Sequence, residues 1–333
     1  MRIAVIGAGA VGGTIAALLD RAGHDVEVTA RGENLKAIQS TGLSLEGAWG
    51  SHVAKPEANE LISRTPEIAF LATKALDARA ALRDNASMLD RVPIVVVQNG
   101  LEGLDLANHE LPNSVAIGAL AMFAASYLRP GCVAVTTPGS TYLGNYENDQ
   151  EVDRITQILR DVLPVHQSKN FLGAQWTKLL VNQINALPAI TGLSAQDTIS
   201  NSQLRKILTK SMKEAAKVGM KSGVKFASVE KFSDSLVRIF AAMPDWIAQL
   251  LPLFMRRKMG ARPNPGSTLQ SIRKGQASEI DYLNGAIVKT AIANGGFAPI
   301  NAELVKLVHE VESSGEFFEP TEVSARIHAA LNT

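Results

Sequence analysis

The sequence is poor in cysteine, in aromatic residues and in net charge. Cys132 is the only cysteine among 333 residues, which excludes an intramolecular disulfide and a metal site with several cysteine ligands. Lys+Arg 33 against Asp+Glu 32 gives a formal net charge of +1, and this balance argues against a nucleic-acid-binding surface. The six histidines are scattered without metal-ligand spacing, so no metal is expected. These features suit a protein of the reducing cytoplasm.

Long apolar runs are also absent. The stretch 237–255 is apolar and three basic residues follow it, but Pro244, Asp245 and Pro252 interrupt it. No run reaches the ~20 apolar residues that a membrane-spanning helix needs, and no signal-peptide cleavage pattern follows the N-terminus. We expect no membrane span. Core helices or a helical lid are favoured for this stretch, while a surface-lying helix or an oligomer contact, such as a homodimer, stays open.

The N-terminus carries a strand, a glycine turn and a helix in register. Residues 2–6 are apolar and β-branched, and the turn Gly7-Ala8-Gly9-Ala10-Val11-Gly12 has the spacing G-x-G-x-x-G. Gly7 allows a tight turn, Gly9 lets a pyrophosphate approach the backbone, and Gly12 lets helix pack on strand. The N–H groups of the helix N-terminus then face the phosphates. The pattern predicts a dinucleotide site; the alternative is a glycine-rich turn without a ligand.

The end of the second strand, 25–30, indicates which dinucleotide binds. An NAD site usually carries an acidic residue at this place, whereas this chain has Arg31. A guanidinium can bind a 2′-phosphate with two hydrogen bonds, and a carboxylate would repel it. Glu33 lies nearby and Arg31 could be a solvated loop charge, but we favour NADPH.

The first half of the chain alternates strand and helix patterns. Strands are expected at 2–6, 25–30, 67–73, 94–97 and 114–120, with helices at 14–22, 34–40 and 75–88 and extra strands within 121–146. This alternation predicts a mainly parallel sheet covered by helices, a Rossmann-type α/β domain. Ligands bind beyond the C-terminal ends of such strands. Lys74 and Asn99 lie there and are candidates to contact cofactor or substrate, unless they are ordinary loop residues.

The second half reads as helices throughout. They are expected at 172–190, 203–222, 229–255, 279–293, 302–312 and 322–331, each with apolar residues at helical spacing. We therefore predict two domains, an α/β domain at 1–168 and an all-α domain at 169–333.

The first of these helices has a narrow polar stripe. Lys178, Asn182 and Asn185 are spaced i, i+4 and i+7 in an otherwise apolar segment, which places them on one helical face. A solvated face would normally be broader and richer in charge. The stripe suggests a cleft for a small polar molecule; the alternative is a narrow face toward solvent.

Two later segments carry further polar candidates. Ser267 with Gln270 fits a capping box, so Ser267 is expected as a helix N-cap, and with Asn264 it could also hold a carboxylate. Glu279 is either catalytic or simply an acidic residue in a first helical turn, as Asp281 could be.

Taken together, these motifs resemble the ketopantoate reductase (2-dehydropantoate 2-reductase) family over nearly the whole chain. The matching pieces are GAGAVG at 7–12, Arg31, Thr73-Lys74, Gln98-Asn99-Gly100, KLLVN at 178–182, Asn264 with Ser267, and SEIDYLNG at 278–285. The resemblance implies a Rossmann domain and a helical domain with the active site between them.

The resemblance also implies roles for individual residues. Lys178 would protonate the ketone oxygen as hydride arrives, and Glu279 would bind the substrate hydroxyl and support that lysine. Substrate-binding positions would be Asn182, Asn185, Asn264 and Ser267. The cofactor side would comprise Gly7, Ala8, Gly9, Ala10, Val11, Gly12, Arg31, Lys74 and Asn99.

Two departures from the family pattern concern the substrate. The second asparagine usually lies eight residues after the lysine, whereas Asn185 lies seven after Lys178, and the segment 232–262 is longer and more apolar than in compact members. The favoured function is NADPH-dependent reduction of 2-dehydropantoate to pantoate, in the pathway to pantothenate and coenzyme A. The alternatives are a paralogue that reduces another small 2-oxo acid or ketone, and a non-catalytic NADPH-sensing protein.

Overall fold

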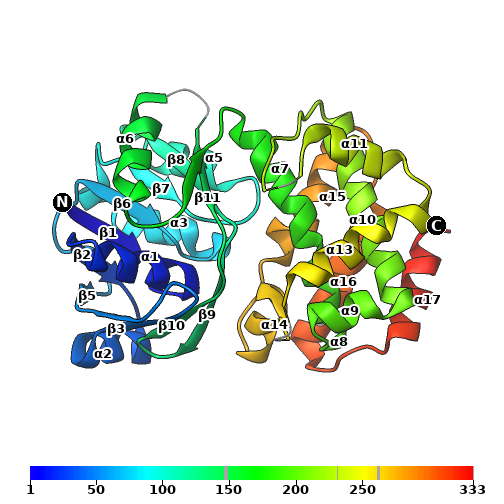
Figure 1. Ribbon diagram of the computed structural model, residues 1–333, viewed down its shortest axis with the longest axis horizontal. Coiled ribbons are helices and arrows are strands. Elements are labelled where there is room, and N and C mark those ends of the chain that lie inside the picture. Colours follow the sequence, from blue (N-terminus) through cyan, green and yellow to red (C-terminus); the bar gives the residue numbers. More distant parts are fainter. Residues whose placement is uncertain (146–148, 231, 261–262, 333) are drawn as a thin grey trace. The chain divides into compact units, whose positions relative to one another are not determined.

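The computed structural model describes residues 1–145, 149–230, 232–260 and 263–332. The chain divides into two compact units, Met1–Ala174 and Gln175–Thr333. Strands and helices alternate in the first unit, whereas the second is built from helices (Figure 1). The observed division falls inside helix α7 (Phe171–Asn182), a few residues after the boundary expected from the change of pattern.

The first unit contains an eight-stranded sheet in the order β12-β11-β8-β7-β6-β1-β2-β5. Neighbouring strands are parallel except for the antiparallel pair β8 and β11. This arrangement and the helical second unit confirm the expected fold class. The strands are β1 (Arg2–Ile6), β2 (Asp25–Thr29), β5 (Glu57–Asn59), β6 (Ile68–Leu71), β7 (Ile94–Val96), β8 (Ala116–Ala121), β11 (Thr141–Gly144) and β12 (Val165–Gln167).

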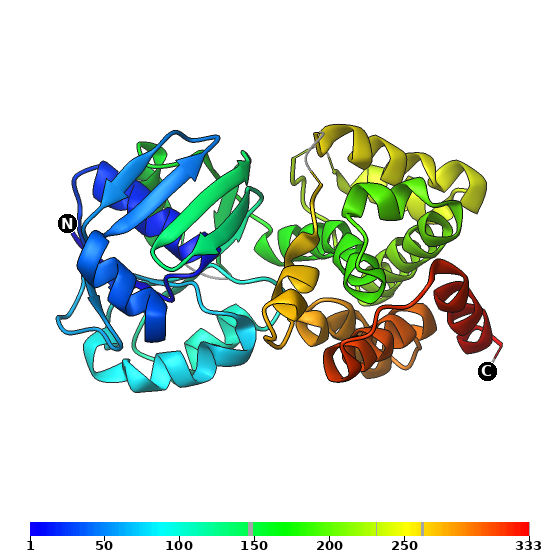
Figure 2. The ribbon, with the colours of Figure 1, turned by 90° about the horizontal axis from the view of Figure 1, so that it is seen from below.

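A second, four-stranded sheet has the order β4-β3-β10-β9. Its strands are β3 (Leu43–Gly47), β4 (His52–Ala54), β9 (Ala124–Arg129) and β10 (Cys132–Thr137). Figure 2 shows the blue and green arrows of this sheet side by side, from segments far apart in the chain. The extra strands expected within 121–146 are β9, β10 and β11, although residue 146 lies outside the described residues. Sequence reasoning missed β3, β4 and β5.

Helix α1 (Ala10–Arg21) packs against strands of both sheets. The remaining helices of this unit are α2 (Gly32–Thr41), α3 (Ala75–Asp84), α4 (Ala86–Leu89), α5 (Gly103–Glu110) and α6 (Asp149–Arg160). The helix expected over 75–88 is thus divided. Asn85 lies between its two parts, fully buried, and its side-chain oxygen accepts a hydrogen bond from the Ile62 amide at 2.7 Å.

The long helix α10 (Ser202–Lys221) lies at the centre of the second unit and contacts most of the other helices of that unit. The other elements are the 3₁₀ turn η1 (Gln183–Asn185), α8 (Ala186–Thr191), α9 (Ala195–Ser200), α11 (Asp234–Ala242), α12 (Asp245–Ala248), α13 (Leu250–Lys258), α14 (Gly266–Arg273), the 3₁₀ turn η2 (Ile280–Tyr282), α15 (Asn284–Ala293), α16 (Pro299–Ser314) and α17 (Pro320–Ala330).

Two of the long helices expected from the sequence are not continuous in the structure, so these two predictions are wrong. The segment 172–190 is broken by η1, and 229–255 forms the three helices α11, α12 and α13, with Pro244 as the N-cap of α12. A proline ring disfavours the helical conformation in the residue before it, so the break before Pro244 has a local cause. In the part of the chain that the structure describes, no helix is long and apolar enough to cross a membrane.

A buried polar cluster ties the helices of the second unit together. Gln183, Ser211, Asn284 and Asn301 are each 0% exposed. The Gln183 side-chain oxygen accepts hydrogen bonds from Ser211 Oγ at 2.6 Å and Asn284 Nδ2 at 2.9 Å, and Asn284 Nδ2 also donates to Asn301 Oδ1 at 3.0 Å. These bonds join η1, α10, α15 and α16. Of these, η1 directly follows the helix that bears Lys178, and α15 begins five residues after Glu279.

Replacing Asn301 with alanine should lower the free energy of unfolding by about 2–4 kcal/mol, because buried partners in one network are left unpaired. Asn301 Nδ2 also donates to Glu214 Oε2 at 2.6 Å, so several groups lose a partner at once. Urea unfolding of the variant measures the change, with exposed Asn294→Ala as the control. A change as small as the control's would show that the cluster adds nothing to stability.

Candidate active site

The glycine turn of the first unit is held by side chains from neighbouring segments. The Gly7 amide donates to Thr29 Oγ1 at 3.0 Å, and Asn34 Nδ2 donates to the Ala8 carbonyl at 2.9 Å. Gly7 has φ +99°, and a Cβ there would lie 2.9 Å from Thr73 Cγ2. A side chain at this position would be strained and crowded. Asn34 was not foreseen as a residue that fixes the turn.

The same turn leaves open space where a phosphate would approach. A Cβ at Gly9 would have no neighbour within 4 Å, whereas a Cβ at Gly12 would overlap the Gly7 carbonyl. Gly9 is the N-cap of α1 and makes no side-chain cap, and the first turn carries no acidic residue. The N–H groups of Ala10, Val11 and Gly12 are therefore suited to an anion. These residues fit a dinucleotide pyrophosphate.

Arg31 follows β2 and is the N-cap of α2. Its side chain is 71% exposed, and its guanidinium lies 3.8 Å from an Asp84 carboxylate oxygen. An exposed ion pair of this length is worth at most about 1 kcal/mol, so it would not prevent the guanidinium from binding a phosphate. Because β1 and β2 are parallel neighbours, Arg31 and the glycine turn lie at the same edge of the sheet.

Lys74 and Asn99 follow β6 and β7 at this same edge. Both are half-buried, and Lys74 is the N-cap of α3. Gln98 Nε2 donates to the Thr73 carbonyl at 2.9 Å, which joins the two loops that carry them. Since Thr73 also lies against Gly7, these contacts position both loops beside the glycine turn.

Lys178 is a buried lysine on α7. This residue is only 9% exposed. Burial lowers the pKa of its ammonium to about 8, and the carboxylate of Glu279 opposes part of that shift by Coulombic attraction. The structure therefore brings Lys178 and Glu279 within electrostatic reach of each other. An amine with this pKa can exchange a proton near neutral pH.

The polar stripe changes its geometry after Lys178. Asn182 ends α7 and Asn185 ends the 3₁₀ turn η1, and both are half-buried. In a 3₁₀ turn the residues i and i+3 are eclipsed, so Asn182 and Asn185 stay on one side of the chain. A spacing of seven residues already lies near one face of a regular α-helix, and the 3₁₀ turn keeps Asn185 on the side of Asn182 and Lys178.

Asn185 and Asn264 meet at Gly266. Asn264 Oδ1 accepts a hydrogen bond from the Gly266 amide at 2.9 Å, and a Cβ at Gly266, where φ is +72°, would lie 2.7 Å from Asn185 Oδ1. The Asn264 amide in turn donates to Gln196 Oε1 at 2.9 Å. The absence of a side chain at Gly266 thus lets the side-chain amides of Asn185 and Asn264, two candidate substrate-binding residues, both lie close to Gly266.

The expected N-cap role of Ser267 is wrong. Helix α14 begins at Gly266 with Pro265 as its N-cap and has no side-chain cap. The helix begins two residues earlier than a capping box with Ser267 as N-cap would require, at Gly266, which has a left-handed φ and whose amide donates to Asn264 Oδ1. Ser267 is exposed in the first turn of α14, so its hydroxyl is not used as a cap.

Glu279 lies outside a regular α-helix. It is the half-buried N-cap of η2, and its carbonyl accepts hydrogen bonds from the Tyr282 and Leu283 amides at 3.0 and 3.1 Å. The expectation that it sits in the first turn of an α-helix is therefore wrong, because α15 begins only at Asn284. Asp281, two residues later, is exposed and pairs with His309 at 3.1 Å.

Comparisons with known proteins match this arrangement over both units. The family described as "Ketopantoate reductase PanE/ApbA" matches residues 3–148, and its C-terminal family matches residues 170–312. The 2-dehydropantoate 2-reductase of Pyrococcus horikoshii is 28% identical over 95% of this chain and 99% of its own. That of Archaeoglobus fulgidus is 27% identical over 94% and 98%.

Solved structures share the fold. A PanE/ApbA family ketopantoate reductase from Ralstonia eutropha has a TM-score of 0.78 at 28% identity, over 94% of this chain and 99% of its own. D-mandelate dehydrogenase with NADH and anilino(oxo)acetate has a TM-score of 0.80 at 23% identity, with the same coverage. The glycine turn, the buried lysine and its glutamate occur in a chain that belongs to the ketopantoate reductase PanE/ApbA family.

Proposed function

We propose that this chain is an NADPH-dependent 2-dehydropantoate 2-reductase that converts 2-dehydropantoate to pantoate. NADPH supplies the hydride that adds to the carbonyl carbon. The Lys178 ammonium stabilises the negative charge that develops on the carbonyl oxygen and donates a proton to it. The observation that carries the proposal is the buried Lys178, with a pKa of about 8, in reach of the Glu279 carboxylate.

In this proposal the remaining polar residues of the helical unit hold the substrate. Glu279 accepts a hydrogen bond from the substrate hydroxyl, and Asn264 and Ser267 bind the carboxylate shared by all 2-oxo acids. Asn182 and Asn185 orient the substrate beside the lysine. The contact of Asn185 with Gly266 and the bond from Gly266 to Asn264 support a common site for these amides.

The cofactor side of the proposal rests on the first unit. The backbone at Gly7, Ala8, Gly9, Ala10, Val11 and Gly12 would cradle the pyrophosphate, with Arg31 on the 2′-phosphate and Lys74 and Asn99 at the neighbouring loops. The open space above Gly9 and the uncapped start of α1 support this assignment.

Replacing Arg31 with alanine should raise the KM for NADPH about 10–150-fold and leave the KM for NADH nearly unchanged. The factor corresponds to one lost charge-assisted hydrogen bond, roughly 1.5–3 kcal/mol. Initial rates with both cofactors test this. Equal losses for NADPH and NADH would show that Arg31 does not read the 2′-phosphate.

Reduction should slow as the pH rises above about 8, approaching a tenfold loss in kcat/KM per pH unit, because the lysine must be protonated to act as an acid. The sign follows from the pKa of Lys178, which is about 8; below it the ammonium form predominates. A pH profile measured at saturating NADPH checks the position of the fall. A profile that stays flat up to about pH 10 would assign the proton to another donor.

The alternative substrates remain other small 2-oxo acids or ketones. D-mandelate dehydrogenase shares the fold at 23% identity, which shows that the fold alone does not choose the substrate. NADPH oxidation with 2-dehydropantoate beside a panel of 2-oxo acids decides between them. If none of these substrates supports NADPH oxidation, the result would favour the alternative of a non-catalytic NADPH-sensing protein.

We further propose a homodimer in the reducing cytoplasm. Side chains of the segment 237–255 are unusually exposed for their size, namely Ile239 at 52%, Trp246 at 75% and Leu250 at 62%. An exposed apolar patch of this kind commonly marks an interface. Light scattering during size-exclusion chromatography tests the dimer, with Trp246→Glu as the disrupting variant.

A further inference from the structure

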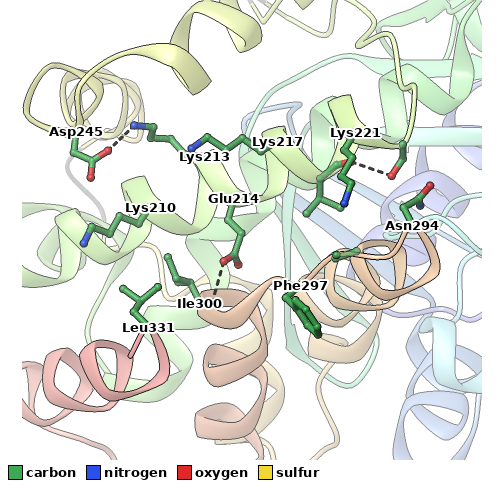
Figure 3. A pocket seen from close by; sticks show the side chains of 14 residues that line it. Lys210, Lys213, Glu214, Lys217, Lys221, Asp245, Asn294, Phe297, Ile300 and Leu331 are labelled. Carbon is green, nitrogen blue, oxygen red and sulfur yellow. Dashed lines mark hydrogen bonds and ion pairs between the residues drawn. The ribbon is translucent and has the colours of Figure 1, made fainter. Parts of the chain in front are cut away.

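The helical unit contains a pocket that none of the proposed catalytic residues lines. It has a volume of ≈ 420 Å³, and its walls come from α10, α12, the end of α15, the start of α16 and the residue after α17. Figure 3 shows four lysines in a row along α10, with Phe297 and Leu331 also lining the pocket. The volume lies within the range of small-molecule sites.

The four lysines form one stripe of positive charge. Lys210, Lys213, Lys217 and Lys221 are spaced by three, four and four residues on a continuous helix, so they share a face. Like charges at this spacing repel one another and destabilise a helix by a few tenths of a kcal/mol per pair. A solvated face would normally intersperse acidic residues. Binding of an anion would therefore relieve the repulsion between these lysines.

Two of the lysines already have partners. Lys213 Nζ donates to Asp245 Oδ1 at 2.5 Å and to the Met243 carbonyl at 2.7 Å, and Lys221 Nζ donates to the Gly295 carbonyl at 3.3 Å. Lys210 and Lys217 are exposed and make no hydrogen bond or ion pair within the described residues. Lys217 is within Coulombic range of Glu214, but neither ammonium group donates a hydrogen bond to the described residues, so both can bind a ligand.

Glu214 is the one carboxylate among the lysines on this helix face, and it forms hydrogen bonds with residues at the start of α16. It accepts hydrogen bonds from the Ile300 and Asn301 amides at 3.1 and 2.8 Å and from Asn301 Nδ2 at 2.6 Å. It thus caps the N-terminus of α16, where a negative charge is favoured. Burial raises the pKa of this carboxyl. With Asp245 paired to Lys213, the pocket keeps an excess of positive charge.

The opposite wall of the pocket offers an aromatic face. Phe297 is 88% exposed, more than any other large apolar side chain of the described chain, and Leu331 is 41% exposed. Such a ring gains by stacking on a flat ligand, about 1–3 kcal/mol for a nucleobase. The pocket thus combines an exposed aromatic ring with two ammonium groups that make no hydrogen bond within the described residues.

We propose that this pocket binds an organic phosphate carrying an aromatic ring, of the size of a nucleoside diphosphate. The phosphates contact Lys210 and Lys217, and the ring stacks on Phe297. Neither feature alone would distinguish the ligand, since free phosphate would use only the lysines and an uncharged ring only Phe297.

Titration calorimetry with ADP tests the proposal on the full chain saturated with NADPH, so that the dinucleotide site is already filled. Lys210→Gln/Lys217→Gln should weaken ADP binding about 10–100-fold through lost charge-assisted bonds. Phe297→Ala should weaken it about 5–100-fold. Adenosine and inorganic phosphate should each bind less tightly than ADP.

The matched control is Lys206→Gln/Lys306→Gln, which removes two exposed lysines of the same unit outside the pocket. It should change ADP affinity less than about threefold, the effect of general charge on screened surface groups. No saturable binding to the NADPH-saturated protein, or equal losses in both double variants, would overturn the proposal. NADPH oxidation by the same variants, which should stay near wild type, keeps this outcome separate from the proposed reductase activity.

Discussion

Replacing Lys178 with alanine should lower kcat for 2-oxo acid reduction by about 10²–10⁴, the range for a lost general acid. The side chain is buried beside Glu279 and has a pKa of about 8, so it is protonated in a large fraction of molecules at neutral pH and is poised to give up that proton. Stopped-flow single turnovers with preformed NADPH complex measure the chemical step directly. A variant that turns over near the wild-type rate would refute the assignment.

A second substitution separates lost chemistry from lost structure. Lys178→Met keeps most of the side-chain volume and removes the ammonium, so it should be inactive yet more stable than wild type near neutral pH. The folded pKa of about 8 lies below the ordinary value of 10.5, so burying the charged form costs stability below pH 8. That cost fades as the pH rises toward 10.5, and the difference in Tm should vanish with it.

The cofactor edge of the first unit could be predicted because its causes are local. The apolar strand 2–6, the glycine turn and the following helix are contiguous in the sequence. In the structure a Cβ at Gly7 or at Gly12 would lie too close to neighbouring atoms, which explains the glycines at these two positions. The parallel sheet followed from alternation alone. Strands β3 and β4 of the second sheet were missed, although the alternation Leu43-Ser44-Leu45-Glu46 in β3, with both leucines 0% exposed, was a usable signal. Its pairing with β10 joins distant segments and leaves no local trace.

The helical unit shows a different limit. Lys178 stood out in an apolar helix and Glu279 through the resemblance of 278–285 to a family motif. The cluster of Gln183, Ser211 and Asn301 did not, because its hydrogen bonds join residues far apart in the chain. The break at η1 and the early start of α14 at Gly266 also escaped the helical pattern. A positive φ at one glycine decided the second case. A glycine permits a positive φ but does not require it, so the contacts around it decide whether that φ is adopted.

Glu279 should decide which 2-oxo acid is accepted. Wild-type enzyme should prefer 2-dehydropantoate over 2-oxoisovalerate, which lacks the hydroxyl, by about 10²–10⁴ in kcat/KM, because the analogue leaves a half-buried carboxylate without its partner. Glu279→Ala should reduce this preference to roughly tenfold or less, mostly by harming 2-dehydropantoate. Ser267→Ala and Asn264→Ala should instead weaken both substrates alike, through the shared carboxylate.

Glu279 also raises the pKa of Lys178, so its removal would reduce the protonated fraction of the lysine and slow both substrates. Measuring the ratio of kcat/KM values at about pH 6, well below the pKa of about 8 for Lys178, reduces this effect. Asp281→Ala is the matched control, since that exposed carboxylate pairs with His309 and should leave the ratio unchanged. If wild type prefers the analogue, or if Glu279→Ala harms both substrates equally at that pH, the 2-dehydropantoate assignment fails. The Lys178 chemistry would stand, and the hydroxyl would have to be read by another residue or be absent from the true substrate.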